Sequence, residues 1–193
     1  MKRWYRATSV LFIGLTMIAS TAAADVAATD ALGWDHYLGR NGRPLDYAKA
    51  KVLFEQGVQE DFALSHYGLA TLYSRGLGVD RDYLRARYHY EKAAEGGVRR
   101  AYYNLGVFYH KGLGVTQNNA RARMLFTTAA KMGEPHAYLT LGIFDEEGLV
   151  DGSVNLNSAI QWYRQAVAGG VVDAQKRLDR LVPRLYEEIS DEE

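Results

Sequence analysis

Hydrophobic residues recur every 36 positions over most of this chain. Residues 65–73 align with residues 101–109 and again with residues 137–145, so three stretches keep one register. Within the middle stretch, Ala101, Leu105 and Tyr109 fall at i, i+4 and i+8, which is the spacing of one helical face. Self-similarity at this period is typical of proteins built from stacked supersecondary units. The pattern therefore predicts a repeat protein whose units contain amphipathic helices.

A second apolar set with the same helical spacing follows each of these stretches, and polar caps and glycines mark the helix ends. Asp and Asn accept hydrogen bonds from the free amides of a first helical turn, and glycine enters the left-handed conformation that often ends a helix. The expected starts are Asp46, Asp82, Asn118 and Asn155, and the expected ends are Gly76, Gly97, Gly112, Gly133, Gly148 and Gly170. We predict an all-α fold in which each unit is helix, glycine turn, helix, glycine turn.

These residues resemble the Sel-1-like repeat family, a relative of the tetratricopeptide repeats. The family pattern, Ala-x3-Leu-Gly-x2-Tyr-x2-Gly-x-Gly-Val followed by Ala-x6-Ala-Ala-x2-Gly, is matched closely by residues 101–133. Residues 65–97 match with Ser65 for Ala and Ala70 for Gly, whereas residues 137–170 carry Asp145 in place of the Tyr and one extra residue in the turn. The resemblance implies a helix-turn-helix repeat solenoid with the right-handed superhelix of tetratricopeptide repeats.

The repeats divide the chain into segments. We expect a partial repeat at 46–64 and further repeats at 65–100, 101–136 and 137–173. Because Tyr37 lies 36 positions before Tyr73, residues 25–45 are an N-terminal segment or a degenerate half repeat. Residues 174–193 are expected to form a capping helix and an acidic tail, with a kink or an early end at Pro183.

The first 24 residues have the pattern of a secretory signal peptide. Lys2, Arg3 and Arg6 precede a short apolar run, and small residues follow up to Ala24. We predict cleavage after Ala24 and a periplasmic protein with no stable membrane insertion afterwards; secretion is the second choice, and an uncleaved anchor is the alternative. The absence of cysteine means that disulfides do not hold the exported protein together.

Composition and motifs give little support for a catalytic, metal-binding or nucleic-acid-binding site. The 193 residues contain 23 basic and 23 acidic side chains, a balance that does not favour a nucleic-acid partner. The sequence has no cysteine, no phosphate-binding loop and no HExxH motif, so we expect no catalytic residues, no metal and no cofactor. A metal site that joins His110 and His136 to Glu146 or Glu147 is an alternative without motif support.

The candidate binding residues come from the resemblance. In tetratricopeptide-like superhelices the first helices line a concave groove, and the corresponding positions here include Tyr67 and Tyr103, which fall off the packing face. Tyrosine is a frequent binding anchor because it adds contact area at little cost in rotamer entropy. The predicted partner-binding residues are Tyr67, Thr71, Ser74, Arg75, Arg100, Tyr103, Val107, His110, Lys111, His136, Leu139, Ile143, Glu146 and Glu147.

Two functions remain open at this point. The first is a non-enzymatic adaptor or scaffold that binds a protein or peptide partner. The resemblance implies a role in envelope regulation or assembly, with an envelope protein as the expected partner. The alternative is a glycan-binding or peptidoglycan-binding protein or a cell-wall hydrolase that uses Tyr67, Tyr103 and the Glu146/Glu147 pair. Neighbouring helical residues point about 100° apart, which argues against a matched acid/base pair. The sequence does not indicate an oligomeric state.

Overall fold

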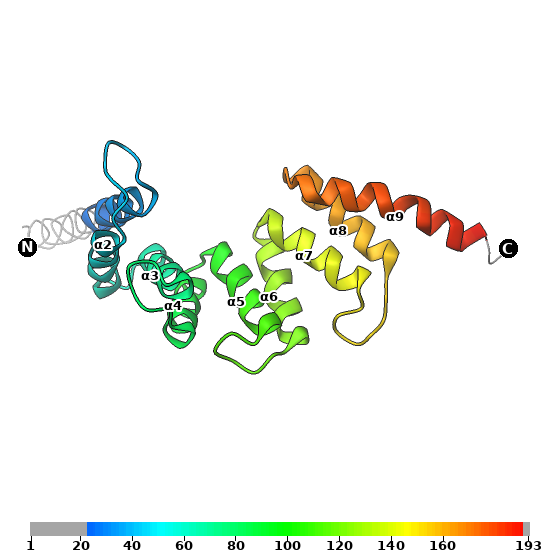
Figure 1. Ribbon diagram of the computed structural model, residues 1–193, viewed down its shortest axis with the longest axis horizontal. Coiled ribbons are helices and arrows are strands. Elements are labelled where there is room, and N and C mark those ends of the chain that lie inside the picture. Colours follow the sequence, from blue (N-terminus) through cyan, green and yellow to red (C-terminus); the bar gives the residue numbers. More distant parts are fainter. Residues whose placement is uncertain (1–22, 191–193) are drawn as a thin grey trace, which may run out of the picture. The chain divides into compact units, whose positions relative to one another are not determined.

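The computed structural model describes residues 23–190, and in that range it contains helices and no strand (Figure 1). The chain divides into two compact units, Met1–Asp82 and Tyr83–Glu193. None of the described helices combines the length and the apolar character that crossing a membrane requires. The predicted signal peptide falls mainly on residues 1–22, which lie outside the described residues.

The first unit contains the helical residues 23–38, α2 (Tyr47–Gln59) and α3 (Ala63–Arg75). The side chain of Asp46 accepts a hydrogen bond from the Lys49 amide and caps α2, as predicted. Phe54 of α2 is fully buried, and a Cβ on Gly33 or on Gly68 would lie 2.7 Å from its ring. The two glycines therefore allow the helices on either side to approach this phenylalanine.

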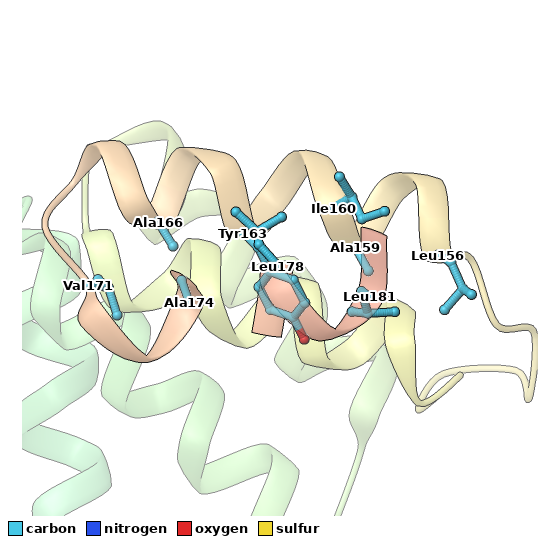
Figure 2. Packing of buried hydrophobic residues seen from close by; sticks show 9 residues of the cluster. All are labelled: Leu156, Ala159, Ile160, Tyr163, Ala166, Val171, Ala174, Leu178 and Leu181. Carbon is cyan, nitrogen blue, oxygen red and sulfur yellow. The ribbon is translucent and has the colours of Figure 1, made fainter. Parts of the chain in front are cut away.

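The second unit contains α4 (Tyr83–Glu95), α5 (Arg99–Lys111), α6 (Asn119–Lys131), α7 (Pro135–Glu146), α8 (Leu156–Ala168) and α9 (Val172–Ser190). Each helix packs on its neighbour in the chain, so the predicted sequence of helix pairs is confirmed. The α8–α9 pair encloses a continuous apolar cluster (Figure 2), which consists of Leu156, Ala159, Ile160, Tyr163, Ala166, Val171, Ala174, Leu178 and Leu181.

The predicted helix boundaries are confirmed where the structure describes the caps. The side chains of Asn118 and Asn155 accept hydrogen bonds from the amides of Arg121 and Ser158. All the glycines predicted at helix ends have a positive φ, with values from 61° at Gly148 to 83° at Gly97 and Gly170. These turns repeat because glycine adopts the left-handed conformation without a Cβ clash.

The register of the first repeat differs from the one expected. In later repeats the backbone amide of the residue that precedes the second helix donates to a carbonyl near the end of the first helix. The Asn118 amide, for example, donates to the carbonyl of Tyr109 at 2.8 Å. In the first repeat the Asp46 amide donates to the carbonyl of His36 at 2.9 Å. His36, and not Tyr37, is therefore the counterpart of Tyr73, and the expected alignment of Tyr37 with Tyr73 is wrong by one residue.

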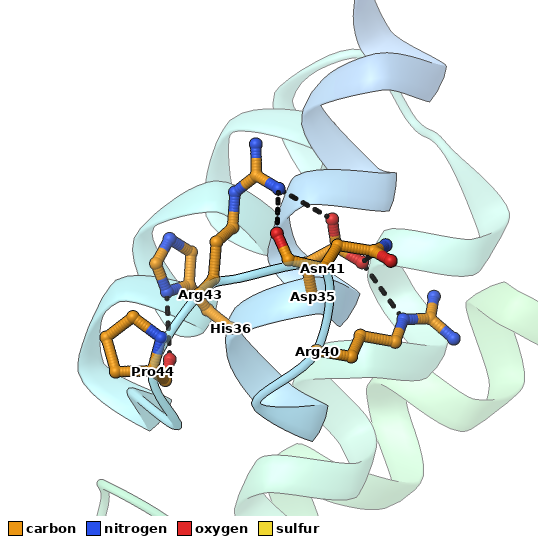
Figure 3. A network of polar contacts seen from close by, with 6 residues as sticks. All are labelled: Asp35, His36, Arg40, Asn41, Arg43 and Pro44. Atoms are coloured by element: carbon orange, nitrogen blue, oxygen red, sulfur yellow. Dashed lines mark hydrogen bonds and ion pairs between the residues drawn. The ribbon is translucent and has the colours of Figure 1, made fainter.

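A polar network fixes the turn of this first repeat (Figure 3). The Asp35 carboxylate accepts hydrogen bonds from Arg40 at 2.9 Å, from Asn41 at 2.8 Å and from Arg43 at 3.1 Å. Asn41 has a φ of 56°, a left-handed conformation that asparagine tolerates better than most residues. The turn is thus held by side chains of residues 40–43 that close over the preceding helix.

The C-terminal helix α9 continues past Pro183 to Ser190. The alternative in which Pro183 ends the helix early is therefore wrong. The buried face of α9 carries Ala174 and Leu178 at the positions of Ala137 and Leu141, so α9 repeats the pattern of a first helix. Exposed Asp179 stands where α7 has Gly142, and a second helix could not approach α9 there as closely as Tyr163 approaches Gly142.

Candidate functional site

The predicted binding residues lie on α3 in the first unit and on α5 and α7 in the second, with Glu147 directly after α7. In the first unit, Tyr67 is half-buried and Arg75 is exposed. Thr71 is buried, and its hydroxyl donates to the Tyr67 carbonyl at 2.8 Å, while the Ser74 hydroxyl donates to the Thr71 carbonyl at 3.1 Å. Tyr67 and Arg75 are thus the better placed of the four to meet a partner.

Two aromatic residues that the sequence analysis missed join Tyr67. The ring centroid of Trp34 lies 5.8 Å from that of Tyr67 and 5.2 Å from that of Tyr37, and Arg75 forms a side-chain hydrogen bond with Tyr37. The one-residue error in register concealed this contribution of the first repeat. The signal was present, because Ala28-x3-Leu32-Gly33 carries the Ala-x3-Leu-Gly pattern of the later repeats.

A buried carboxyl lies beneath this group of rings. Asp30 is 3% exposed and accepts hydrogen bonds from the Ser65 hydroxyl at 2.8 Å and from the Trp34 side chain. Burial raises the pKa of the Asp30 carboxyl, and the hydrogen bonds from Ser65 and Trp34 offset only part of that effect. Asp30 thereby fixes Trp34 against the interior of the first unit.

In the second unit, the ring of Tyr103 lies partly in the core. Its centroid is 5.5 Å from that of Phe126 and 6.3 Å from that of His136. Its side chain packs on the apolar cluster of α6 and α7, which consists of Ala122, Phe126, Ala129, Ala130, Ala137, Leu141 and Phe144. Truncation of Tyr103 would therefore change stability as well as any binding surface. His136 is exposed at the start of α7.

Other predicted residues of α5 and α7 differ in accessibility. His110 is half-buried, with its Nδ1 atom 2.9 Å from Oδ1 of Asn119 and its ring beside Phe144. Val107, Leu139 and Ile143 are half-buried. Val107 packs against the apolar cluster of α6 and α7, and Leu139 and Ile143 pack against that of α8 and α9. Lys111 and Arg100 are exposed, and the Arg100 side chain extends toward the buried carboxylate of Glu134. The accessible charges on α5 are therefore basic.

Glu146 and Glu147 have different environments. The Glu146 carboxylate is 11% exposed and accepts hydrogen bonds from the Tyr163 hydroxyl at 2.5 Å, from Arg177 at 2.7 Å and from Arg180. Burial alone would raise the pKa of Glu146, but these hydrogen bonds and the two arginine charges outweigh it and hold the pKa below its usual value. Glu147 is exposed, and its backbone N–H donates to the carbonyl of Ile143 at the end of α7.

This arrangement gives no support to an acid/base pair. A general acid at neutral pH needs a carboxyl with a raised pKa, as in glycosidases, and Glu146 has the opposite shift. Its oxygens are occupied by α8 and α9 side chains, so Glu146 connects α7 to the C-terminal helix.

Asp145, which replaces the family tyrosine, is also structural. It is 5% exposed and accepts hydrogen bonds from Arg123, from the Ser158 hydroxyl and from the Trp162 indole at 3.0 Å. Among the described residues no three metal-ligating side chains converge, so the structure does not assemble the alternative metal site around His110 and His136.

Comparison with known proteins gives the family. Residues 26–61, 63–98, 99–134 and 135–171 each match the Sel1 repeat. A crystal structure of a Sel1 repeat protein from Oxalobacter formigenes is 30% identical with a TM-score of 0.72, and the match covers 81% of this chain and 64% of that one. The crystal structure of c5321, a protective antigen present in uropathogenic Escherichia coli strains that displays an SLR fold, is 31% identical with a TM-score of 0.70, and the match covers 81% of this chain and 33% of that one. The chain thus spans less than two thirds of the length of these relatives. No curated protein matched the chain.

Proposed function

The chain belongs to the Sel1 repeat family, whose repeats typically act as binding modules, and we propose that it is a non-enzymatic adaptor that holds a protein or peptide partner through the exposed side chains of its first helices. One observation carries the proposal. A half-buried tyrosine followed eight residues later by an exposed basic residue occurs in both units, as Tyr67 with Arg75 and as Tyr103 with Lys111. Eight residues rise about 12 Å along a helix, so each ring and its cation lie about two turns apart on the same helix. Such a pair suits a segment with both apolar and acidic side chains.

The proposal includes export. The charged start, apolar run and Ala-rich end of residues 1–24 support secretion to the periplasm with Asp25 as the mature N-terminus, and an envelope protein is then the expected partner. Mass spectrometry of the protein recovered from the periplasm tests this directly. Material that still carries residues 1–24 would contradict it.

A glycan partner is the second candidate because aromatic rings stack on sugars, and Tyr67 and Tyr103 are both partly accessible. We rank it lower because the exposed charges on α3 and α5 are basic. In addition, Glu146, the carboxylate that a hydrolase would use, is held by Arg177 and Arg180.

The test is capture of partners from an envelope extract by the purified chain, with a peptidoglycan pull-down in parallel. Lys111→Glu reverses an exposed charge on α5, and Lys131→Glu reverses a charge on α6 that is also exposed. We expect specific protein capture that falls with the α5 variant and persists with the α6 variant. Capture of peptidoglycan alone, or equal capture by both variants, would contradict the proposal.

A further inference from the structure

Resting on that proposed function, we propose that Trp34, Tyr37, Tyr67 and Arg75 of the first unit form a subsite for an acidic side chain that stands next to a large apolar side chain in an extended partner segment. We call these four residues the Trp34 cluster. Their contacts and burial, and the counterparts of Trp34 in the other repeats, support this assignment.

The three rings form a continuous aromatic surface. Trp34 lies 5.2 Å from Tyr37 and 5.8 Å from Tyr67 between ring centroids, and all three residues are only half-buried. Tyr37 in turn lies 5.5 Å from Tyr47 of α2. Such a surface offers a large, rigid contact area to an apolar side chain, since each ring is already fixed by its neighbours.

The repeat itself does not require a large side chain at position 34. With the corrected register, Trp34 is the counterpart of Thr71, Val107 and Ile143, which are all much smaller. The Trp34 indole is nevertheless held in place, because the Asp30 carboxylate accepts one hydrogen bond from the Trp34 side chain and one from the Ser65 hydroxyl. Asp30 is thus a positioning residue for the aromatic surface.

Arg75 supplies the charge. Its side chain is exposed, it hydrogen-bonds Tyr37, and among the side chains described in residues 23–183 no carboxylate forms an ion pair with it. A guanidinium has five N–H donors in a planar fork, so the bond to one hydroxyl leaves donors for a carboxylate. By contrast, Arg40 and Arg43 of the same unit are already paired with Asp35. Arg75 is therefore suited to a carboxylate brought by a partner.

Selection of peptides from a random display library on the full chain tests the assignment. We expect enriched sequences to carry Asp or Glu next to an aromatic or large aliphatic residue. Fluorescence anisotropy then measures the affinity of the strongest peptide. The Arg75→Glu variant should bind this peptide at least tenfold more weakly than the unmodified chain does. The unmodified chain should lose at least tenfold in affinity when the acidic residue of the peptide is replaced by Gln or Asn. Lys49→Glu, the same charge reversal at an exposed site on α2, should change the affinity less than twofold.

A spectroscopic readout separates a role in binding from a role in folding. In a 15N spectrum the Trp34 indole N–H signal should shift when the peptide is added, and Asp30→Asn should move that signal in the free protein. A chain that enriches no peptide overturns both the proposed function and this subsite. Enriched peptides that lack acidic residues, or that bind Arg75→Glu as tightly as the unmodified chain, overturn the subsite and leave the proposed function standing.

Discussion

The polar contacts described between α7 and α9 converge on one carboxylate, that of Glu146, and its removal should produce a loss of stability whose size follows from those contacts. Glu146 receives hydrogen bonds from the fully buried Tyr163, from Arg177, whose side chain is 28% exposed, and from Arg180, whose side chain is 63% exposed. A hydrogen bond to a charged group contributes about 1.5–3 kcal/mol when it is buried, and an exposed ion pair contributes under about 1 kcal/mol. The Tyr163 and Arg177 bonds therefore dominate the effect.

We expect Glu146→Gln to lower the free energy of unfolding by about 1–2 kcal/mol, because the amide keeps an acceptor oxygen but loses the charge. Glu146→Ala should cost about 2–3 kcal/mol, because it also leaves the Tyr163 hydroxyl and Arg177 without their acceptor. The neighbouring exposed residue provides a matched control, and Glu147→Gln should change stability by less than about 0.5 kcal/mol. Urea unfolding followed by circular dichroism measures all three.

The pH dependence of the same variants identifies the charge as the cause. Because the pKa of Glu146 is lowered in the folded protein, its stabilising contribution is fully present above the usual value of 4.5 and is lost as the pH falls through the folded value. The unfolding free energies of the unmodified chain and of Glu146→Gln should therefore converge in acid. Equal effects of Glu146→Gln and Glu147→Gln at neutral pH, or a difference that persists in acid, would refute this reasoning.

Three further predictions concern a glycine with a positive φ and two buried carboxylates. Gly112 has a φ of 68°, so Gly112→Val should lower the free energy of unfolding by about 1–3 kcal/mol, whereas Gly112→Asn should cost less; a thermal melt compares them. The raised pKa of Asp30 means that its unfavourable contribution grows as the pH rises above 3.8, so Asp30→Asn should flatten that fall in stability, measured by urea unfolding from pH 4 to 8. Arg123→Met leaves buried Asp145 without its cation and should cost about 3–5 kcal/mol, while Arg121→Met on the exposed face of α6 should cost under about 1 kcal/mol in the same assay.

The core of the repeats could be predicted from the sequence because it depends on periodicity alone. Ala122, Phe126 and Ala129 were expected on the buried face of a second helix, and each is fully buried. The same holds for the glycine turns, since a positive φ favours glycine so strongly that its recurrence every repeat reveals the backbone conformation. The helix pairs, their caps and the glycine turns could thus be predicted from the sequence.

The first repeat was harder to align because its turn has no Gly-x-Gly. Asn41 provides the left-handed residue and the arginines around Asp35 provide the contacts, so the usual signal is missing. The close contact of Gly33 with Phe54, like that of Gly106 with Phe126, identifies the correct register in the structure. The binding residues depended on this register, and for that reason Trp34 and Tyr37 were not found from the sequence.

Side chains that depart from the repeat pattern fall into two groups, and the difference indicates which ones serve binding. Several polar residues occupy core positions, and each has a partner inside its own unit: Asp35 has Arg40 and Arg43, and Asp145 has Arg123. Burying a carboxylate without such partners would cost free energy, so the arginines explain why these carboxylates are tolerated at core positions. Arg75 is different, because its charge has no carboxylate among the described residues. Arg75 lies beside aromatic rings that the fold does not fully bury. Selection for binding a partner is the simplest physical explanation of such a charge.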